Sequence, residues 1–129
     1  MIIQHHISLK NYNTFGINAY ASKFLTINSV NELREILAKE SDVFLLSGGS
    51  NMLLLNNIEK LVLHINIKGI EVVKEDDSHA YVKVESGENW HDFVLWCIEN
   101  DLGGLENLSL IPGNVGTSPI QNIGAYGVE

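Results

Sequence analysis

The sequence is poor in the residues from which several classes of protein are built. It has one cysteine, Cys97, which excludes an internal disulfide framework and argues against a cysteine-based zinc site. No apolar run approaches the roughly 20 residues that span a bilayer, and the first residues lack the regions of a signal peptide. Eight Lys and Arg stand against 16 Asp and Glu, a balance that argues against nucleic-acid binding. We therefore expect a cytoplasmic protein with neither a membrane nor a nucleic acid as its partner.

The remaining composition is suited to a folded domain. The chain has 129 residues, a usual length for one domain, and 45% of them are hydrophobic. Six of its eleven glycines lie in the last 27 residues, so a turn-rich segment is expected to follow the regular elements. The absence of a terminal signal at Glu129 suggests a part of something longer.

Capping signals and apolar periodicity predict two helices. Ser29 and Glu32 form a capping box before an apolar stripe, which predicts a helix over 30–40. Asn89 is a good N-cap for a second helix, which the two glycines at 103–104 are expected to end. The buried stripe of this second helix is predicted to contain Trp90, Phe93, Val94, Cys97 and Ile98. On this stripe Cys97 is interpreted as a small, inert core residue.

Strands are predicted between and around these helices. The short apolar run 43–46 is typical of a buried strand, and 61–68 and 80–84 alternate as half-buried strands do. The acidic segment 75–78 is expected to form the turn before the last of them. Strands and helices in this mixed order indicate an α+β fold and not a strict βαβ alternation.

A glycine-rich turn follows the apolar run 43–46, and its residues are Gly48, Gly49, Ser50, Asn51 and Met52. Consecutive N–H groups in such a turn can form a nest for phosphate oxygens. The segment matches neither the Walker A loop nor the dinucleotide-binding G-x-G-x-x-G pattern. A plain tight turn accounts for these residues equally well.

A second segment, 111–125, combines small, apolar and amide residues. Ser118, Pro119 and Gln121 carry the signature of a helix start, whose N–H groups are suited to an anion. Gln121 and Asn122 have amides that can read the edge of a heteroaromatic ring. So many small residues favour close approach to a ligand over a plain surface loop. The binding residues predicted here are Ile111, Pro112, Gly113, Gly116, Ser118, Pro119, Gln121, Asn122, Gly124 and Ala125.

No catalytic or metal-ligating residue is assigned within the chain. The five histidines lack the spacing of ligands, and we interpret His91, in the first turn of the second helix, as an ordinary surface or capping residue. No Ser-His-Asp arrangement or carboxylate pair is recognisable.

Five blocks spread along the chain resemble the N-terminal part of the UDP-N-acetylenolpyruvoylglucosamine reductases, also called UDP-N-acetylmuramate dehydrogenases. The blocks are residues 13–17, 48–53, 87–91, 104–108 and 111–127. The last block resembles the type I subclass found in enterobacteria. The resemblance implies an FAD-binding domain of the vanillyl-alcohol oxidase and p-cresol methylhydroxylase type, truncated here.

The resemblance also implies a function in bacterial peptidoglycan synthesis, and hence in cell-wall biogenesis, cell shape and cell division. In this family NADPH reduces FAD, and a hydride then passes to the enolpyruvyl group of UDP-N-acetylenolpyruvoylglucosamine. Residues 48–52 would hold the FAD diphosphate, and 111–125 would line the diphosphate and the isoalloxazine. Residues 1–129 are interpreted as an incomplete FAD-binding domain without the substrate-binding domain. The family's catalytic Ser and Glu and its Arg near the flavin would lie beyond Glu129, and no obligate protein partner is implied.

Two alternatives remain at this point. The chain could be a non-catalytic remnant that folds and at most binds a flavin nucleotide, or part of a flavin oxidase of the same broad superfamily. As a test of residues 48–52, Gly49→Val is expected to abolish flavin retention and leave the fold intact.

Overall fold

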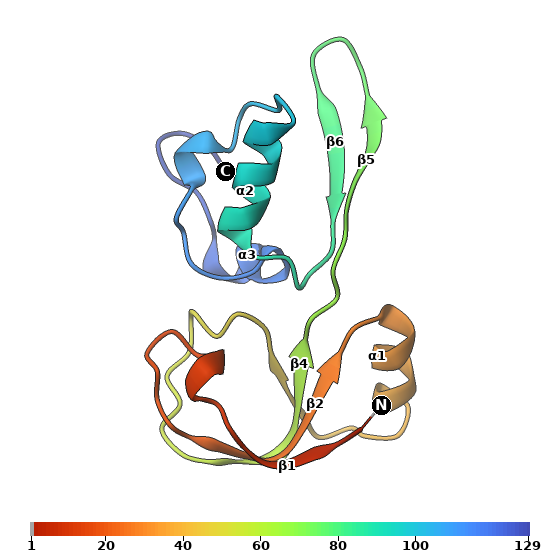
Figure 1. The fold of residues 1–129 in the computed structure, drawn as a ribbon, viewed down its shortest axis with the longest axis vertical. Helices are drawn as coiled ribbons and strands as arrows, with labels where there is room; N and C mark the ends of the chain where they lie inside the picture. The colour runs from red at the N-terminus through yellow and green to blue at the C-terminus, as the bar shows by residue number, and fades with distance from the viewer. Residues whose placement is uncertain (1) are drawn as a thin grey trace. The chain divides into compact units, whose positions relative to one another are not determined.

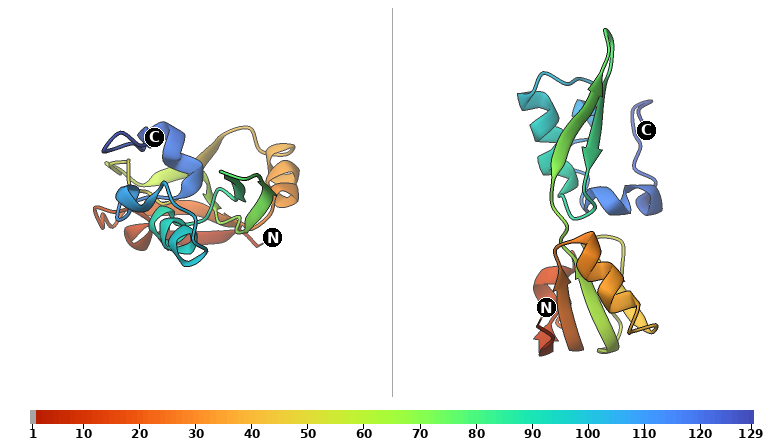
Figure 2. Two further views of the ribbon diagram at one scale, coloured as in Figure 1. Left: turned by 90° about the horizontal axis from the view of Figure 1, so that it is seen from above. Right: turned by 90° about the vertical axis from the view of Figure 1, so that its right-hand side faces the viewer.

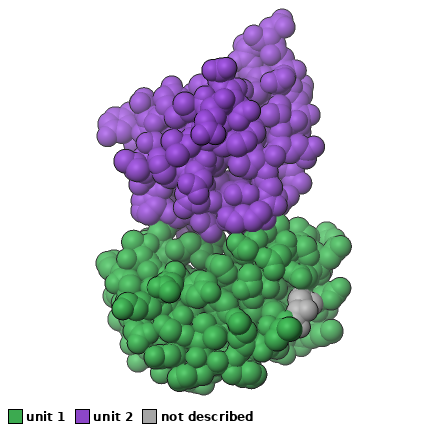
Figure 3. All heavy atoms as spheres, viewed as in Figure 1, with its two compact units in different colours: residues 1–67 green, residues 68–129 purple. Residues whose placement is uncertain are grey.

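The structure, a computed structural model, describes residues 2–129 and consists of two compact units (Figures 1 and 3). Unit 1 ends at Ile67 and unit 2 begins at Lys68. Helices and strands alternate irregularly along the chain, which confirms the predicted α+β class. Among residues 2–129, no helix has both the length and the apolar character needed to cross a bilayer.

Unit 1 is built on a four-stranded sheet with the order β1-β2-β4-β3. β1 runs antiparallel to β2, whereas β2 and β3 both run parallel to β4. The strands are β1 (Gln4–Ser8), β2 (Tyr20–Ile27), β3 (Val43–Leu46) and β4 (Ile58–Ile65), and a short 3-10 helix, η1 (Lys10–Tyr12), follows β1. The predicted strand 43–46 is confirmed, and the one predicted over 61–68 begins and ends three residues earlier.

β4 is buried on both faces, so the expected half-buried alternation is wrong for its centre. Leu61, Val62 and Leu63 are all buried, although Val62 was expected to face outward. The cause is the position of β4 between two parallel neighbours with a packed layer on each face. Leu61 and Leu63 belong to the cluster that contains Ile36 of the helix, whereas Val62 joins the cluster around Leu9 on the other face.

The first helix, α1 (Val30–Leu37), begins where the capping signal placed it and ends three residues before the expected 40. The Ser29 hydroxyl accepts a hydrogen bond from the N–H of Glu32 at 3.2 Å. The Glu32 carboxylate accepts one from the N–H of Asn28 at 2.7 Å, one residue before the cap. The two bonds satisfy N–H groups at the start of the helix, which stabilises it.

Unit 2 begins with a hairpin of β5 (Ile70–Glu75) and β6 (Ala80–Val84), and helix α2 (Trp90–Glu99) follows (Figure 2). The acidic turn between the strands is confirmed. The Asp76 carboxylate there accepts hydrogen bonds from the N–H groups of Ser78 and His79 at 2.9 and 2.8 Å. These bonds lower the pKa of Asp76 below its ordinary value.

The start of α2 is confirmed, but its end and part of its stripe differ from the prediction. The Asn89 side chain accepts from the N–H of Asp92 at 3.1 Å. The helix ends at Glu99 because Asp101 turns into the left-handed region, with φ 57°, and the N–H of Leu102 donates to the Cys97 carbonyl at 2.8 Å. The glycines at 103–104 therefore do not end it. Ile98 is 49% exposed and does not belong to the buried stripe.

The rest of unit 2 consists of short turns of helix, namely η2 (Glu106–Leu108), η3 (Val115–Thr117) and α3 (Ser118–Gln121). The predicted cap at Ser118 is wrong, because η3 runs directly into α3 and Ser118 is already helical, with φ −54° and ψ −41°. Thr117 stands at the N-cap position and makes no capping hydrogen bond with its side chain. Pro119 does lie in the first turn, as predicted.

Candidate functional site

The turn after β3 is packed against a second loop of unit 1. Gly49 is buried with φ 64°, a conformation that suits glycine. Its carbonyl accepts a hydrogen bond from the N–H of Thr14 at 3.1 Å. The turn is thus held against the loop that connects β1 to β2.

That connecting loop is organised by Asn13, whose side chain is buried and fully used. Its amide nitrogen donates to the carbonyls of Leu9 and Ile17 at 2.7 and 3.0 Å. Its amide oxygen accepts from the N–H of Ile17 at 3.0 Å. This is a structural explanation for the sequence block 13–17, because a buried amide that satisfies three backbone groups fixes the loop that supports Gly49.

The turn at residues 48–52 leaves several backbone donors available. Within residues 2–129, the N–H groups of Gly48, Gly49, Asn51 and Met52 donate no hydrogen bond. Backbone N–H groups in a folded protein almost always have a partner, and successive free ones in a turn are suited to an anion. The turn therefore has unbonded donors of the kind that phosphate oxygens accept from.

The second predicted segment is held by the chain around the start of α2. The N–H of Val115 donates to the Glu88 carbonyl at 2.8 Å, and the N–H of Trp90 donates to the Gly113 carbonyl at 2.9 Å. The Trp90 indole N–H donates to the Leu108 carbonyl at 2.8 Å. Hydrogen bonds to the N-terminus of α2 and to Glu88 just before it therefore hold residues 108–115 in place.

At Gly116 the close approach that requires a glycine is to protein, not to open space. A Cβ there would lie 2.5 Å from the Cβ of Ser86 and 2.8 Å from its carbonyl oxygen. The N–H of Gly116 donates to that same carbonyl at 3.1 Å. The N–H groups of Thr117 and Ser118 are also bonded, to the carbonyls of Asn114 and Val115. The free amides expected at this helix start are therefore not found at residues 116–118.

The end of the segment is more open. Asn122 is left-handed, with φ 52°, and ends α3, after which residues 125–128 close a small turn in which the N–H of Ala125 donates to the Val128 carbonyl at 3.0 Å. A hollow of about 220 Å³ adjoins this turn. It is lined by Asn122, Ile123, Gly124, Ala125, Gly127, Val128 and Glu129. Three of the predicted binding residues (122, 124 and 125) thus share one small hollow.

The other predicted residues divide between the two units. Residues 48–52 lie in unit 1, and 111–125 lie in unit 2. Of the second set, Gly113 is buried, and five residues are exposed, namely Pro112, Gly116, Pro119, Asn122 and Gly124. Cys97 is 4% exposed on the inner face of α2, as predicted, and burial raises the pKa of its thiol.

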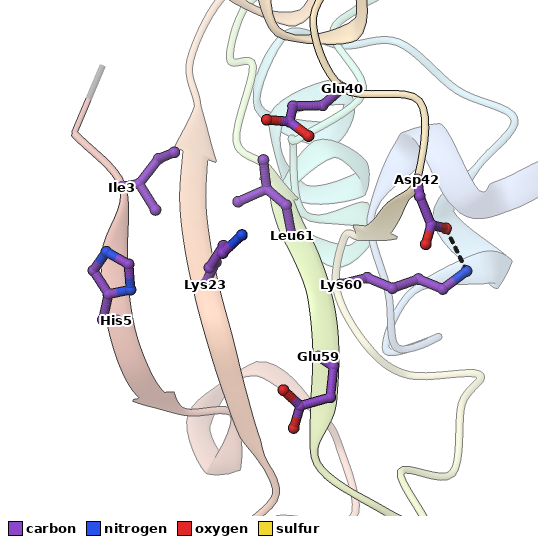
Figure 4. Close-up of a pocket in the computed structure, with 8 residues that line it drawn as sticks. All are labelled: Ile3, His5, Lys23, Glu40, Asp42, Glu59, Lys60 and Leu61. Carbon is purple, nitrogen blue, oxygen red and sulfur yellow. Dashed lines mark ion pairs between the residues drawn. The ribbon is translucent and has the colours of Figure 1, made fainter.

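Another hollow, of about 320 Å³, lies on the sheet of unit 1 and contains none of the predicted residues (Figure 4). It is lined by Ile3, His5, Lys23, Glu40, Asp42, Glu59, Lys60 and Leu61. Lys60 pairs with Asp42 at 2.5 Å, and the Glu59 carboxylate accepts from the Ser22 hydroxyl at 2.7 Å. Most of its charges are thus engaged within the unit, so this hollow is a weaker site than the turn at 48–52.

His91 makes a hydrogen bond that its sequence context did not predict. Its Nδ1 accepts a hydrogen bond from the N–H of Leu110 at 3.1 Å. Leu110 directly precedes the predicted residues Ile111, Pro112 and Gly113. The only signal in the sequence was the position of His91 at the end of the block 87–91, because a lone histidine predicts no partner.

Comparison with known proteins identifies the family of this chain. A family model described as an FAD binding domain matches residues 22–129. The chain belongs to this family. The chain is also 60% identical to the UDP-N-acetylenolpyruvoylglucosamine reductase of Flavobacterium johnsoniae, over 100% of the chain and 39% of the relative. The reductases of Pseudomonas savastanoi and Amoebophilus asiaticus are 52% and 48% identical to it, over 98% and 100% of the chain.

These relatives confirm the resemblance predicted from the five blocks, and the chain spans 39% of the length of each of them. A crystal structure of the UDP-N-acetylenolpyruvylglucosamine reductase of Thermus caldophilus has the same fold. It matches with a TM-score of 0.74 over 98% of this chain and 46% of that protein, at 24% identity. The fold of this FAD binding domain is thus the one expected from the sequence.

Proposed function

We propose that this chain supplies much of the FAD site of a cytoplasmic, NADPH-dependent UDP-N-acetylenolpyruvoylglucosamine reductase of peptidoglycan synthesis. The observation that carries the proposal is the 60% identity to such a reductase over the whole chain. In this proposal residues 1–129 are the N-terminal portion of an FAD-binding domain, and the substrate is the UDP-linked enolpyruvyl sugar.

The turn at residues 48–52 fits the diphosphate of FAD. A diphosphate presents several negatively charged oxygens, each of which accepts hydrogen bonds from backbone N–H groups. Four N–H groups of this turn are available, and Gly49 is held in place by the loop of Asn13. The backbone would thus bind the anion without a lysine or arginine.

Residues 111–125 would line the rest of the cofactor. Hydrogen bonds to Glu88 and Trp90 hold Val115 and Gly113 in place, so this part of the segment loses little conformational freedom when the cofactor binds. The hollow beside Asn122, Gly124 and Ala125 offers small residues and an amide to a flat ring.

The chemistry of the reaction is divided between the cofactor and the protein. When bound, FAD would supply the redox chemistry that links NADPH as hydride donor to the enolpyruvyl double bond as hydride acceptor. The residues described here bind and orient the cofactor, and we assign none of them the role of the general acid that protonates the neighbouring carbon.

A second candidate function is flavin binding without turnover. It applies to residues 1–129 taken by themselves, which span 39% of the length of the reductases that they match. In that case residues 1–129 would fold and bind a flavin nucleotide, and no reaction would follow.

A chimeric reductase tests the proposal. Residues 1–129 replace the matching part of the Flavobacterium johnsoniae reductase, and bound FAD and UDP-sugar-dependent NADPH oxidation are measured against the parent enzyme. We expect stoichiometric FAD and activity within about tenfold of the parent. A folded chimera that lacks FAD would contradict the proposal, and one that keeps FAD without activity would support the second function.

The diphosphate assignment is tested within this chimera by Asn51→Asp. The side chain of Asn51 is exposed beside the available N–H groups, so a negative charge there would repel the diphosphate. We expect the dissociation constant of FAD to rise about tenfold, which corresponds to about 1.4 kcal/mol. The matched control is Asn56→Asp, which adds the same charge at another exposed position of the loop between β3 and β4. This control should leave the dissociation constant of FAD unchanged.

A further inference from the structure

His91 and Leu110 are joined by a hydrogen bond whose direction is fixed. A backbone N–H only donates, so the Nδ1 of His91 must be the acceptor and must carry no proton. In the neutral ring the proton is then on Nε2. His91 lies in the first turn of α2 and is half-buried.

Leu110 has a backbone conformation that its residue type disfavours. Its φ of 65° lies in the left-handed region, where a side chain costs about 1–2 kcal/mol. Its own side chain is 77% exposed, so packing of that side chain does not hold the conformation. Such conformations persist where the surroundings determine them, and they gather at ligand-binding segments.

The surroundings of Leu110 come from two consecutive residues of α2. The Trp90 indole holds the carbonyl of Leu108, and the Trp90 N–H holds that of Gly113. Between these two anchors, His91 provides the acceptor for the Leu110 N–H at 3.1 Å. Without this acceptor, the chain between the anchors could relax to a negative φ at Leu110, and the following residues would change direction.

We propose that His91 is a positioning residue of the flavin site: its Nδ1 keeps Leu110 left-handed and so sets the path of residues 111–113. This proposal rests on the proposed function, because residues 111–113 are among those expected to line the cofactor. His91 itself does not touch the cofactor in this proposal.

The first experiment needs no flavin and uses residues 1–129 alone. Hydrogen exchange at the Leu110 amide is compared in the unchanged chain, in His91→Leu, which removes the acceptor, and in His91→Asn. The asparagine Oδ1 occupies about the place of the histidine Nδ1. We expect the amide to exchange at least about fivefold faster in His91→Leu, which corresponds to the loss of one hydrogen bond, and to stay within about twofold in His91→Asn.

The second experiment measures FAD affinity in the chimeric reductase. His91→Leu should raise the dissociation constant about three- to tenfold, and His91→Asn should restore most of the affinity. Leu110→Gly should reduce the effect of His91→Leu to less than about twofold, since glycine adopts φ 65° without steric cost. His79→Leu removes an exposed histidine of the same unit and should change nothing.

The outcomes separate this proposal from the one on which it rests. A chimera that fails to bind FAD with His91 intact contradicts the proposed function, while the exchange data still decide whether His91 holds Leu110. If His91→Asn is as defective as His91→Leu, or if Leu110→Gly does not suppress the defect, His91 acts through packing and the positioning role is wrong.

Discussion

The backbone of Gly49 is in contact with the backbone of Tyr12, with no room between them for a side chain. A Cβ at Gly49 would collide with the Tyr12 carbonyl oxygen and lie 2.9 Å from the α-carbon of Asn13. Backbone atoms in a supported loop cannot give way as the end of a flexible side chain can. The expectation that Gly49→Val leaves the fold intact is therefore wrong, and that variant would not isolate cofactor binding.

Gly49→Ala should destabilise the chain considerably more than Gly16→Ala. The two glycines have the same φ of 64°, but a Cβ at Gly16 would have nothing within 4 Å. We expect the free energy of unfolding to fall by about 1–2 kcal/mol at Gly16, the cost of the left-handed conformation alone. At Gly49 the loss should exceed about 3 kcal/mol, since the collision adds to that cost. Denaturant titration measures both, and equal losses would contradict the contact with Tyr12.

Asn13→Ala should also destabilise the loop that supports Gly49. The change leaves the Ile17 N–H and two carbonyls without the Asn13 side chain as partner, and a buried group left unsatisfied costs about 1–3 kcal/mol. We expect the free energy of unfolding to fall by about 2–4 kcal/mol. Asn11→Ala, at an exposed position of the same loop, should change it by less than about 0.5 kcal/mol.

The local elements of this fold could be predicted from the sequence, because their signals are local. The capping residues Ser29 and Asn89 hydrogen-bond as their residue types predict. The run 43–46 forms β3 as expected. The fold class and the family followed from these elements and from five sequence blocks.

What could not be predicted depends on contacts between distant residues. Val62 is buried because the cluster around Leu9 covers its face of the sheet, and this packing does not appear in the alternation of one strand. The capping pattern at Ser118 failed because η3 precedes it. Gly49 and Gly116 were both interpreted as leaving space for a ligand. Instead, Gly49 lies against the backbone of Tyr12 and Gly116 against that of Ser86, each 30 or more positions away in the sequence. Likewise, nothing in the sequence pairs His91 with Leu110.

Asp101→Gly should stabilise α2. Asp101 is left-handed directly after the helix, where glycine is the preferred residue, and its negative charge lies at the end where the helix dipole favours positive charge. We expect the free energy of unfolding to rise by about 1 kcal/mol. Asp101→Asn removes the charge and keeps a side chain, so it should give only part of the gain. No gain from Asp101→Gly would mean that the carboxylate has a stabilising role.

Cys97 should make the stability of the chain fall at alkaline pH. Burial raises the pKa of its thiol in the folded state, so the unfolded chain ionises first as the pH rises. The stabilising effect is complete below the pKa of an unfolded thiol, about 8.5, and is lost progressively above it. Denaturant titrations between about pH 7 and 10 should show a smaller slope for Cys97→Ala than for the unchanged chain. The same burial predicts slow labelling of Cys97 by thiol reagents unless the protein is unfolded.

Residues 1–129 by themselves should show no UDP-sugar-dependent oxidation of NADPH, even when FAD is supplied. Hydride transfer requires the flavin and the enolpyruvyl group within reacting distance, and loss of this positioning costs several orders of magnitude. Loss of a positioned general acid costs about 10²- to 10⁴-fold more, and no residue described here is assigned that role. The measurement compares NADPH oxidation by the isolated chain with that of the chimeric reductase, with the UDP-sugar present and absent. Turnover by the isolated chain near that of the chimera would mean that an acid and a substrate site lie within these 129 residues.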